Sequence, residues 1–149
     1  MKIEEEIKGH FRNVYHKGVI NLIYTVNQLN YQFEKDLKQH GLTPQQYNVL
    51  RVLQGFRSQC PVSIGFIKER MLEKSSDVSR LVDKLYRKGL VERKENKKNR
   101  RQKEVDITKK GVELLLAIKN CERKMDTLLL NLNEEEVNQL NRLLDKIRD

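Results

Sequence analysis

The chain has 149 residues, about the length of one globular domain and enough to bury a core without disulfides. It carries 30 Lys and Arg against 21 Asp and Glu, a net charge of +9, and its two Cys exclude a disulfide-rich secreted scaffold. The longest apolar run, residues 114–118, is too short to span a membrane, and the acidic segment 1–6 is not a signal peptide. We therefore expect one cytoplasmic domain with a polyanion as its candidate partner.

The positive charge is concentrated in one segment. Residues 74–103 contain 12 Lys and Arg but only four Asp and Glu, a net charge of +8, which leaves +1 for the rest of the chain. A run of charge is often no more than a solvated face. A basic segment within a nearly neutral chain is, however, the pattern typical of a surface that contacts nucleic-acid phosphates.

Two Pro and seven Gly are few turn formers, so we expect a mostly helical chain. A first long helix is predicted over residues 5–39, where apolar residues recur at steps of three and four, and Gly41 marks its end. Residues 43–46, Thr-Pro-Gln-Gln, provide an N-cap, a helix-compatible Pro and a capping-box Gln. They predict a second helix that runs to about Phe56.

The centre of the chain predicts a helix-turn-helix. A loop over residues 54–62 precedes a short helix over 63–71. Residues 75–77, Ser-Ser-Asp, all favour helix N-termini and begin a further helix that stops at Gly89. Two short helices joined by a tight polar turn fit this motif.

A β-hairpin follows Gly89, because the periodicity changes there. Residues 90–95 predict a short strand, and residues 103–107 alternate polar and apolar side chains as a second strand does. The loop between them, residues 96–102, is turn-prone and strongly basic.

Two amphipathic helices complete the chain. Thr108 is the predicted N-cap of the first, whose apolar residues extend to Leu132, and residues 133–136 provide the capping signal of the second. Together with the N-terminal helix, they carry more apolar surface than the central unit can cover. We therefore expect a helical interface between chains.

Four stretches resemble the MarR family of bacterial winged helix-turn-helix regulators. Residues 42–50, Leu-Thr-Pro-Gln-Gln-Tyr-Asn-Val-Leu, are similar to the opening of the family's second helix, and residues 78–85, Val-Ser-Arg-Leu-Val-Asp-Lys-Leu, to its recognition helix. Residues 88–93 match the helix-to-strand junction. Arg-Arg at 100–101, followed by residues 105–111, is similar to the wing and the start of the fifth helix.

The resemblance covers essentially the whole chain and implies a mainly α fold. That fold is a winged helix-turn-helix with a two-stranded β-hairpin wing and long N- and C-terminal dimerisation helices. Residues 1–149 would form a single domain, with 42–108 as the DNA-binding lobe and 1–40 and 109–149 as the dimerisation helices. The implied function is that of a homodimeric transcription regulator that binds a pseudo-palindromic operator in double-stranded DNA.

The recognition helix would lie in the major groove with its first turns at the base edges. The candidate contacts there are Ser75, Ser76, Asp77, Ser79, Arg80 and Lys84. Arg80 suits bidentate binding to guanine, which contributes about 1–3 kcal/mol of discrimination. Ser75 could equally serve only as an N-cap, and Lys84 lies far enough along the helix to meet phosphates instead of bases.

The candidate wing contacts are Lys97, Lys98, Arg100 and Arg101. By register with the family, Arg101 matches the wing arginine that enters the minor groove. The family wing usually reads Asp-Pro-x-Asp-x-Arg. This chain has Asn96 in place of the first Asp, Lys97 in place of the Pro and Asn99 in place of the second Asp. We therefore expect a wing without its steadying carboxylate, more positive and more mobile when free, and binding that depends steeply on salt.

The effector is less well defined by the sequence. Many family members respond to small, often phenolic, ligands or to oxidants, and their ligand pockets often lie between the first, second and fifth helices. The residues that would face such a pocket are Tyr15, His16, Val19, Tyr47 and Arg51. All five positions are also compatible with ordinary core or surface roles.

The two cysteines raise the possibility of redox sensing. Cys60 lies just before a helix start, where a thiol can be activated, whereas Cys121 fits the apolar face of a helix. The family's peroxide sensors carry a reactive Cys in the N-terminal helix, and this chain has none there.

No zinc-binding spacing, phosphate loop, nucleophile elbow or paired-carboxylate motif occurs, so we expect no metal, no cofactor and no enzymatic activity. The leading hypothesis is a repressor relieved by a small ligand, with phenols among the candidates. A ligand-independent architectural or auxiliary DNA-binding protein of the same fold, a redox-responsive regulator using Cys60, and an interaction module or RNA binder remain alternatives. The last is the least favoured, because Tyr86 is the only aromatic residue in segment 74–103.

Overall fold

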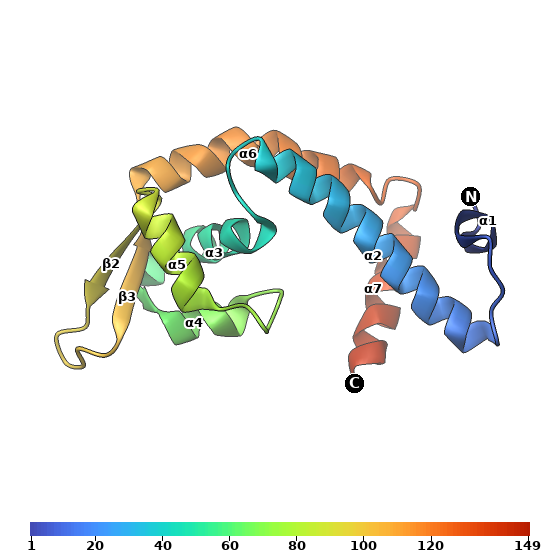
Figure 1. Ribbon diagram of the computed structural model, residues 1–149, viewed down its shortest axis with the longest axis horizontal. Helices are drawn as coiled ribbons and strands as arrows, with labels where there is room; N and C mark the ends of the chain where they lie inside the picture. The colour runs from blue at the N-terminus through green and yellow to red at the C-terminus, as the bar shows by residue number, and fades with distance from the viewer.

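A computed structural model describes residues 1–149 as a lobe from which long helices extend (Figure 1). The helices are α1 (Ile3–Ile7), α2 (Val14–Lys38), α3 (Pro44–Gly55), α4 (Ile64–Arg70), α5 (Val78–Arg87), α6 (Lys109–Thr127) and α7 (Glu134–Arg148). The strands are β1 (Val62–Ser63), β2 (Val91–Glu95) and β3 (Lys103–Ile107), and a short 3-10 turn covers Arg57–Gln59. The lobe contains α3, α4, α5 and the sheet, and α6 runs from the lobe above α2.

The sheet has three antiparallel strands in the order β1-β3-β2. The predicted hairpin is confirmed as β2 and β3, with Arg93 opposite Val105 and Val91 opposite Ile107. The third strand, β1, pairs Val62 with Val105 on the other edge of β3. Its two residues are too few to produce the alternation from which a strand is recognised in a sequence.

The core fills the lobe and continues beneath the long helices. Leu53, Ile67, Leu85 and Val105 are fully buried, and they join α3, α4, α5 and the sheet into one unit. Buried Leu37 of α2 and Ile118 of α6 extend the same cluster out of the lobe. Helix α5 therefore rests on a packed scaffold rather than on a loop.

The local signals at the helix ends are confirmed. Thr43, Thr108 and Asn133 are N-caps whose side chains accept from the backbone N–H three residues on. Gly89 has a φ of +73°, which a glycine adopts without strain, and the next residue, Leu90, donates from its N–H to the Leu85 carbonyl at 3.0 Å. This ending turns the chain from α5 directly into β2.

Two predicted helix bounds are wrong. The single helix predicted over residues 5–39 is divided into α1 and α2, because Lys8 adopts a left-handed conformation with φ of 49° and Gly9 follows it. Asn13 then begins α2 as an N-cap that accepts from the His16 N–H at 2.9 Å. The helix predicted to reach Leu132 ends at Thr127, and a turn occupies the apolar residues after it.

The helices outside the lobe leave much of their apolar surface uncovered. On α2, Val19, Ile23 and Val26 are each about half exposed, and α7 buries none of its residues. Figure 1 shows α7 standing apart from the lobe at the far end of α6. None of the helices combines the length and apolar character needed to cross a membrane.

Candidate nucleic-acid interface

Helix α5 has one apolar side and one polar side. Val78, Val82 and Leu85 are buried in the lobe, which fixes the rotation of the helix. The opposite side exposes Ser79 and Arg80 in the first turns and Lys84 and Arg87 further along. The burial of the apolar side thus presents a row of hydrogen-bonding and positively charged groups to solvent.

The three residues before α5 begin the helix as predicted, but only one of them caps it. Asp77 is the N-cap, and its side chain accepts from the Arg80 N–H at 3.1 Å. Ser76 is buried, with its hydroxyl unpartnered, and Ser75 donates to the Glu73 carboxylate at 3.2 Å. A buried hydroxyl cannot reach a base edge without a change of conformation, so Ser76 does not belong to the exposed surface.

The wing turn is held by its two asparagines. The Asn96 amide oxygen accepts from the Lys98 N–H at 2.8 Å, and the Asn99 amide oxygen accepts from the Arg101 N–H at 3.2 Å. The Asn96 N–H donates to the Gln102 carbonyl at 2.9 Å. The amide oxygens of Asn96 and Asn99 accept where the family wing has carboxylates, and a neutral amide oxygen organises a turn much as a carboxylate does.

The wing side chains remain free for contact. Lys97, Lys98, Arg100 and Arg101 are all exposed, and no side-chain hydrogen bond or ion pair within the chain engages them. The wing turn therefore adds no negative charge of its own to the exposed cations.

Several other basic residues of segment 74–103 are bound within the protein. The Lys88 ammonium donates to the Gly41 carbonyl and to the Gln46 amide oxygen, and Lys74 donates to the Glu69 carbonyl. Arg93 donates to Asp83, and this ion pair lies between α5 and β2. These contacts fix the direction of three basic side chains, and the basic residues of the segment that no internal contact engages lie on α5 and on the β2–β3 hairpin.

A polar cluster joins α3 to α6 behind the lobe. The Tyr47 hydroxyl donates to the Glu122 carboxylate, and the Arg51 Nε lies 3.5 Å from the same carboxylate. Burial, and then the hydrogen bond to Glu122, raise the pKa of Tyr47 far above its ordinary value, so the phenol is neutral at all physiological pH. The sequence analysis named Tyr47 and Arg51 but missed Glu122, which is the group that brings them together.

A hollow of about 260 Å³ opens beside this cluster. Its lining comes from α3 and α6 and consists of Arg51, Gln54, Val112, Leu115, Leu116, Lys119 and Glu122. The Gln54 amide oxygen is buried without a hydrogen-bond partner. The lining combines three apolar side chains, two cations, the Glu122 carboxylate and a free amide acceptor, a mixture that suits a small, partly apolar molecule with polar groups.

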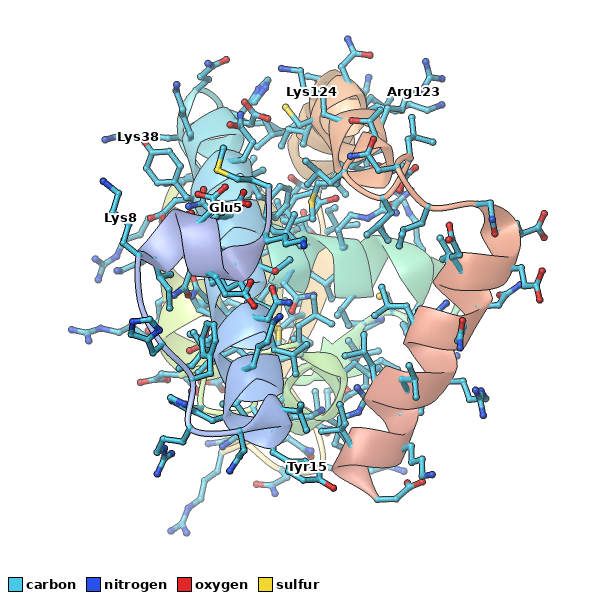
Figure 2. The ribbon with its side chains drawn as sticks, turned by 90° about the vertical axis from the view of Figure 1, so that its right-hand side faces the viewer. Glu5, Lys8, Tyr15, Lys38, Arg123 and Lys124 are labelled. Atoms are coloured by element: carbon cyan, nitrogen blue, oxygen red, sulfur yellow. The ribbon has the colours of Figure 1, made fainter.

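The other three predicted ligand residues lie elsewhere. Tyr15 and Val19 are exposed near the N-terminal end of α2, and His16 accepts from the Arg12 N–H at 3.2 Å through its Nδ1. Figure 2 shows Tyr15 at the end of α2 opposite to Lys38. One chain therefore does not assemble the five predicted residues into a single pocket.

The cysteines do not form an activated site. Burial raises the pKa of the Cys60 thiol to about 11, with the Asp106 carboxylate adding to the effect, and the thiol points to the Leu53 carbonyl at 3.6 Å. A raised pKa lowers the fraction of reactive thiolate, which does not favour a redox role of Cys60. Buried Cys121 lies 3.9 Å from His40, and no group of three or more His, Cys, Asp or Glu gathers closely enough to hold a metal ion.

The three-helix lobe, the hairpin and the exposed basic side of α5 define a winged helix-turn-helix DNA-binding protein. The MarR family model matches residues 40–102. The HTH-type transcriptional regulator MhqR of Bacillus subtilis is 32% identical over 132 residues, which cover 88% of this chain and 89% of that protein. The chain belongs to the MarR family of transcription regulators.

Solved structures of the family share the fold. The DNA complex of MepR from S. aureus has a TM-score of 0.77 at 24% identity and covers 93% of this chain and 97% of that chain. BpsR of Bordetella bronchiseptica, studied for the regulation of its DNA binding by 6-hydroxynicotinic acid, has a TM-score of 0.76 at 20% identity. That alignment covers 89% of this chain and 99% of BpsR. At these identities the two structures support the fold alone.

Proposed function

We propose that this protein is a homodimeric regulator that binds a pseudo-palindromic operator in double-stranded DNA. The observation that carries the proposal is the exposed basic side of α5 next to an exposed basic wing. A helix with this side outward fits the major groove, and a hairpin beside it reaches the adjacent minor groove. The relatives are bacterial regulators, not enzymes, and a protein that binds the bacterial chromosome works in the cytoplasm.

The dimer would form through the helices outside the lobe, within residues 1–40 and 109–149. The half-exposed apolar side chains of α2 and the unburied apolar stripe of α7 support this, because contiguous apolar surface of this kind is rarely left in water. A two-fold dimer presents two α5 helices, which suits half-sites about 34–36 Å apart along the DNA. The lobe, residues 42–108, supplies one helix and one wing to each half-site.

The proposed base contacts come from α5 and the proposed phosphate contacts from both elements. Ser79 and Arg80 lie in the first turns of the exposed side, where base edges are reached, and Lys84 lies nearer the phosphates. Arg101 would enter the minor groove, and Lys97, Lys98 and Arg100 would meet the backbone. Asp77 remains the N-cap of α5, and Ser75 and Ser76 are not among the proposed DNA contacts.

To test this proposal, the protein first selects its preferred duplexes from a random pool. The affinity of each variant for a selected duplex is then measured. Arg80→Ala and Arg101→Ala are each expected to weaken binding to the selected sequence by about tenfold or more, because each removes a groove contact. Lys38→Ala removes the same charge from the exposed end of α2 and is the matched control (Figure 2). Equal losses in all three variants would reject the assigned face, and a pool without enrichment would reject sequence-specific binding itself.

We further propose that the protein is a repressor whose DNA binding is relieved by a small ligand in the hollow between α3 and α6. Its volume, about 260 Å³, is close to the lower end of the roughly 300–1,000 Å³ usual for ligand sites and suits a one-ring compound. Lys119 would bind an acidic group, since Arg51 already lies beside the Glu122 carboxylate, and Val112 and Leu115 would contact the ring. The regulation of BpsR by 6-hydroxynicotinic acid shows that a family fold can respond to an aromatic acid.

Thermal unfolding with a panel of hydroxybenzoic acids distinguishes this regulator from a ligand-independent DNA-binding protein. A ligand of the folded dimer raises the melting temperature in proportion to the logarithm of its concentration. The same compound should weaken operator binding, and Lys119→Ala should abolish both effects. A panel in which no compound moves the melting temperature favours the ligand-independent alternative.

A further inference from the structure

One ion pair connects the two elements that would contact DNA. Arg93 of β2 donates to the Asp83 carboxylate of α5. The guanidinium of Arg93 also lies 4.4 Å from the ring centroid of Tyr86, one helical turn along α5. Arg93 therefore makes two different contacts with the helix, one charged and one with an aromatic face.

The strand register fixes the direction of Arg93. It pairs with fully buried Val105 of β3, and directly opposed residues of paired strands point to the same face of a sheet. The Arg93 side chain is consequently directed towards α5 and is only 28% exposed. Its neighbours Glu92 and Lys94 alternate to the other face and are exposed.

Asp83 lies among the exposed cations of α5. It follows Arg80 by three residues and precedes Arg87 by four, so all three side chains share one side of the helix. A free carboxylate at this place would repel DNA phosphates and could accept a hydrogen bond from the wrong base. Bound to Arg93, the carboxylate has its charge offset and its Oδ1 occupied.

We propose that Arg93 is a positioning residue that fixes the wing relative to α5 and neutralises Asp83, so that the helix and the wing engage their grooves together. The inference rests on the proposed DNA-binding function and deepens it. Because the wing cations remain when Arg93 is removed, general attraction to DNA persists while the simultaneous contact is lost. Arg93 therefore controls the ratio of operator binding to non-specific binding.

The test measures two affinities and two footprints for each variant. The affinities are for a duplex selected by the unaltered protein and for an unrelated duplex of the same length. Hydroxyl-radical cleavage reports the minor-groove contact of the wing, and guanine N7 methylation reports the major-groove contact of α5. Circular dichroism and melting temperature establish that each variant is folded.

Arg93→Ala is expected to lower the ratio of operator to unrelated affinity by about tenfold or more, in line with the loss of one good groove contact. The wing footprint should disappear and the guanine protection should persist. Lys94→Ala, which removes the same charge from the next residue of β2, should leave the ratio and the wing footprint unchanged. Arg93→Lys keeps the charge without the planar guanidinium and should recover part of the ratio.

The inference would be overturned if Arg93→Ala lost both affinities equally and kept the wing footprint. Arg93 would then contribute only its positive charge. If Arg93→Ala does not fold, the comparison of Arg93→Lys with Asp83→Asn decides, since both weaken the pair and should lower the ratio in a folded protein. Failure of the unaltered protein to prefer any duplex is a different result, because it rejects the proposed function and not this pair alone.

Discussion

The Tyr47 hydroxyl donates a hydrogen bond to the Glu122 carboxylate and thereby joins α3 of the lobe to α6. Arg51 approaches the same carboxylate from one turn further along α3. The cluster lies where the lobe meets the long helices, so it sets how the DNA-binding half is attached to the rest of the chain. A ligand in the adjacent hollow would meet Arg51 and Glu122 directly.

Removing this hydroxyl is expected to lower the free energy of unfolding. Tyr47→Phe keeps the ring and its packing on Phe33 but removes the hydrogen bond to Glu122, which retains only its contact with Arg51, at a cost of about 1 kcal/mol for one hydrogen bond. Urea unfolding at pH 7 and one fixed protein concentration measures the change.

Tyr31→Phe is the control for this measurement, because Tyr31 is exposed on α2 and makes no side-chain hydrogen bond. It should change the free energy of unfolding by less than about 0.5 kcal/mol. An equal effect of the two substitutions would show that the Tyr47–Glu122 contact does not stabilise the fold.

Gly111 at the start of α6 is a position where a side chain does not fit. A Cβ placed there would lie 2.7 Å from Ile107 Cγ1 and would also collide with the Leu90 carbonyl. Gly111→Ala is expected to destabilise the protein by about 1–3 kcal/mol through overpacking, measured by thermal or urea unfolding.

Gly55→Ala is the control substitution, because it adds a Cβ where there is free space. It lies at the end of α3 with nothing within 4 Å of the added Cβ, so the substitution should be neutral or stabilise the helix by up to about 1 kcal/mol. Stabilisation by Gly111→Ala would contradict the close packing between α6 and the end of β3.

Cys60 is expected to resist alkylation in the folded protein. With a pKa of about 11 its thiolate fraction at pH 8 is about one thousandth, against about one tenth for a thiol at the ordinary value of 9.0. Labelling with iodoacetamide, followed by mass spectrometry of the Cys60 peptide, should be slow and should accelerate as the pH rises towards 11. Asp106→Asn removes a charge that raises the pKa and should accelerate labelling, whereas labelling at the unfolded rate at pH 8 would show an exposed, ordinary thiol.

The helix ends and the hairpin were predictable because their signals are local. An N-cap such as Thr108 and a terminal glycine such as Gly89 act within four residues of themselves, so the sequence alone contains the interaction. The break between α1 and α2 depends on the left-handed backbone conformation of Lys8, and no sequence pattern predicts that conformation at a lysine. Strand β1 exists only because β3 supplies its partner.

The positive charge of the candidate DNA-binding surface was predictable from the sequence, but the contacts of its basic side chains were not. The sequence shows that Lys88 and Arg93 are basic, but it cannot show that Lys88 binds the Gly41 carbonyl 47 residues away or that Arg93 is paired with Asp83. The partner of Tyr47 is 75 residues away. Such contacts arise only when the core brings α3, α5 and α6 together, and they decide which charged groups remain free.

The free charge on α5 and the wing predicts a steep dependence of DNA binding on salt. Each lobe exposes Arg80, Lys84 and Arg87 together with four wing cations, and a dimer doubles that number. If six to ten of these groups meet phosphates, affinity should fall by about 10³–10⁵-fold between 50 and 200 mM salt. Fluorescence anisotropy of a labelled duplex over this range gives the slope of log K against log salt. Lys97→Ala should reduce the magnitude of the slope by about two, because it removes one phosphate contact from each of the two wings of the dimer. A slope compatible with only one or two phosphate contacts would show that the wings do not reach the DNA backbone.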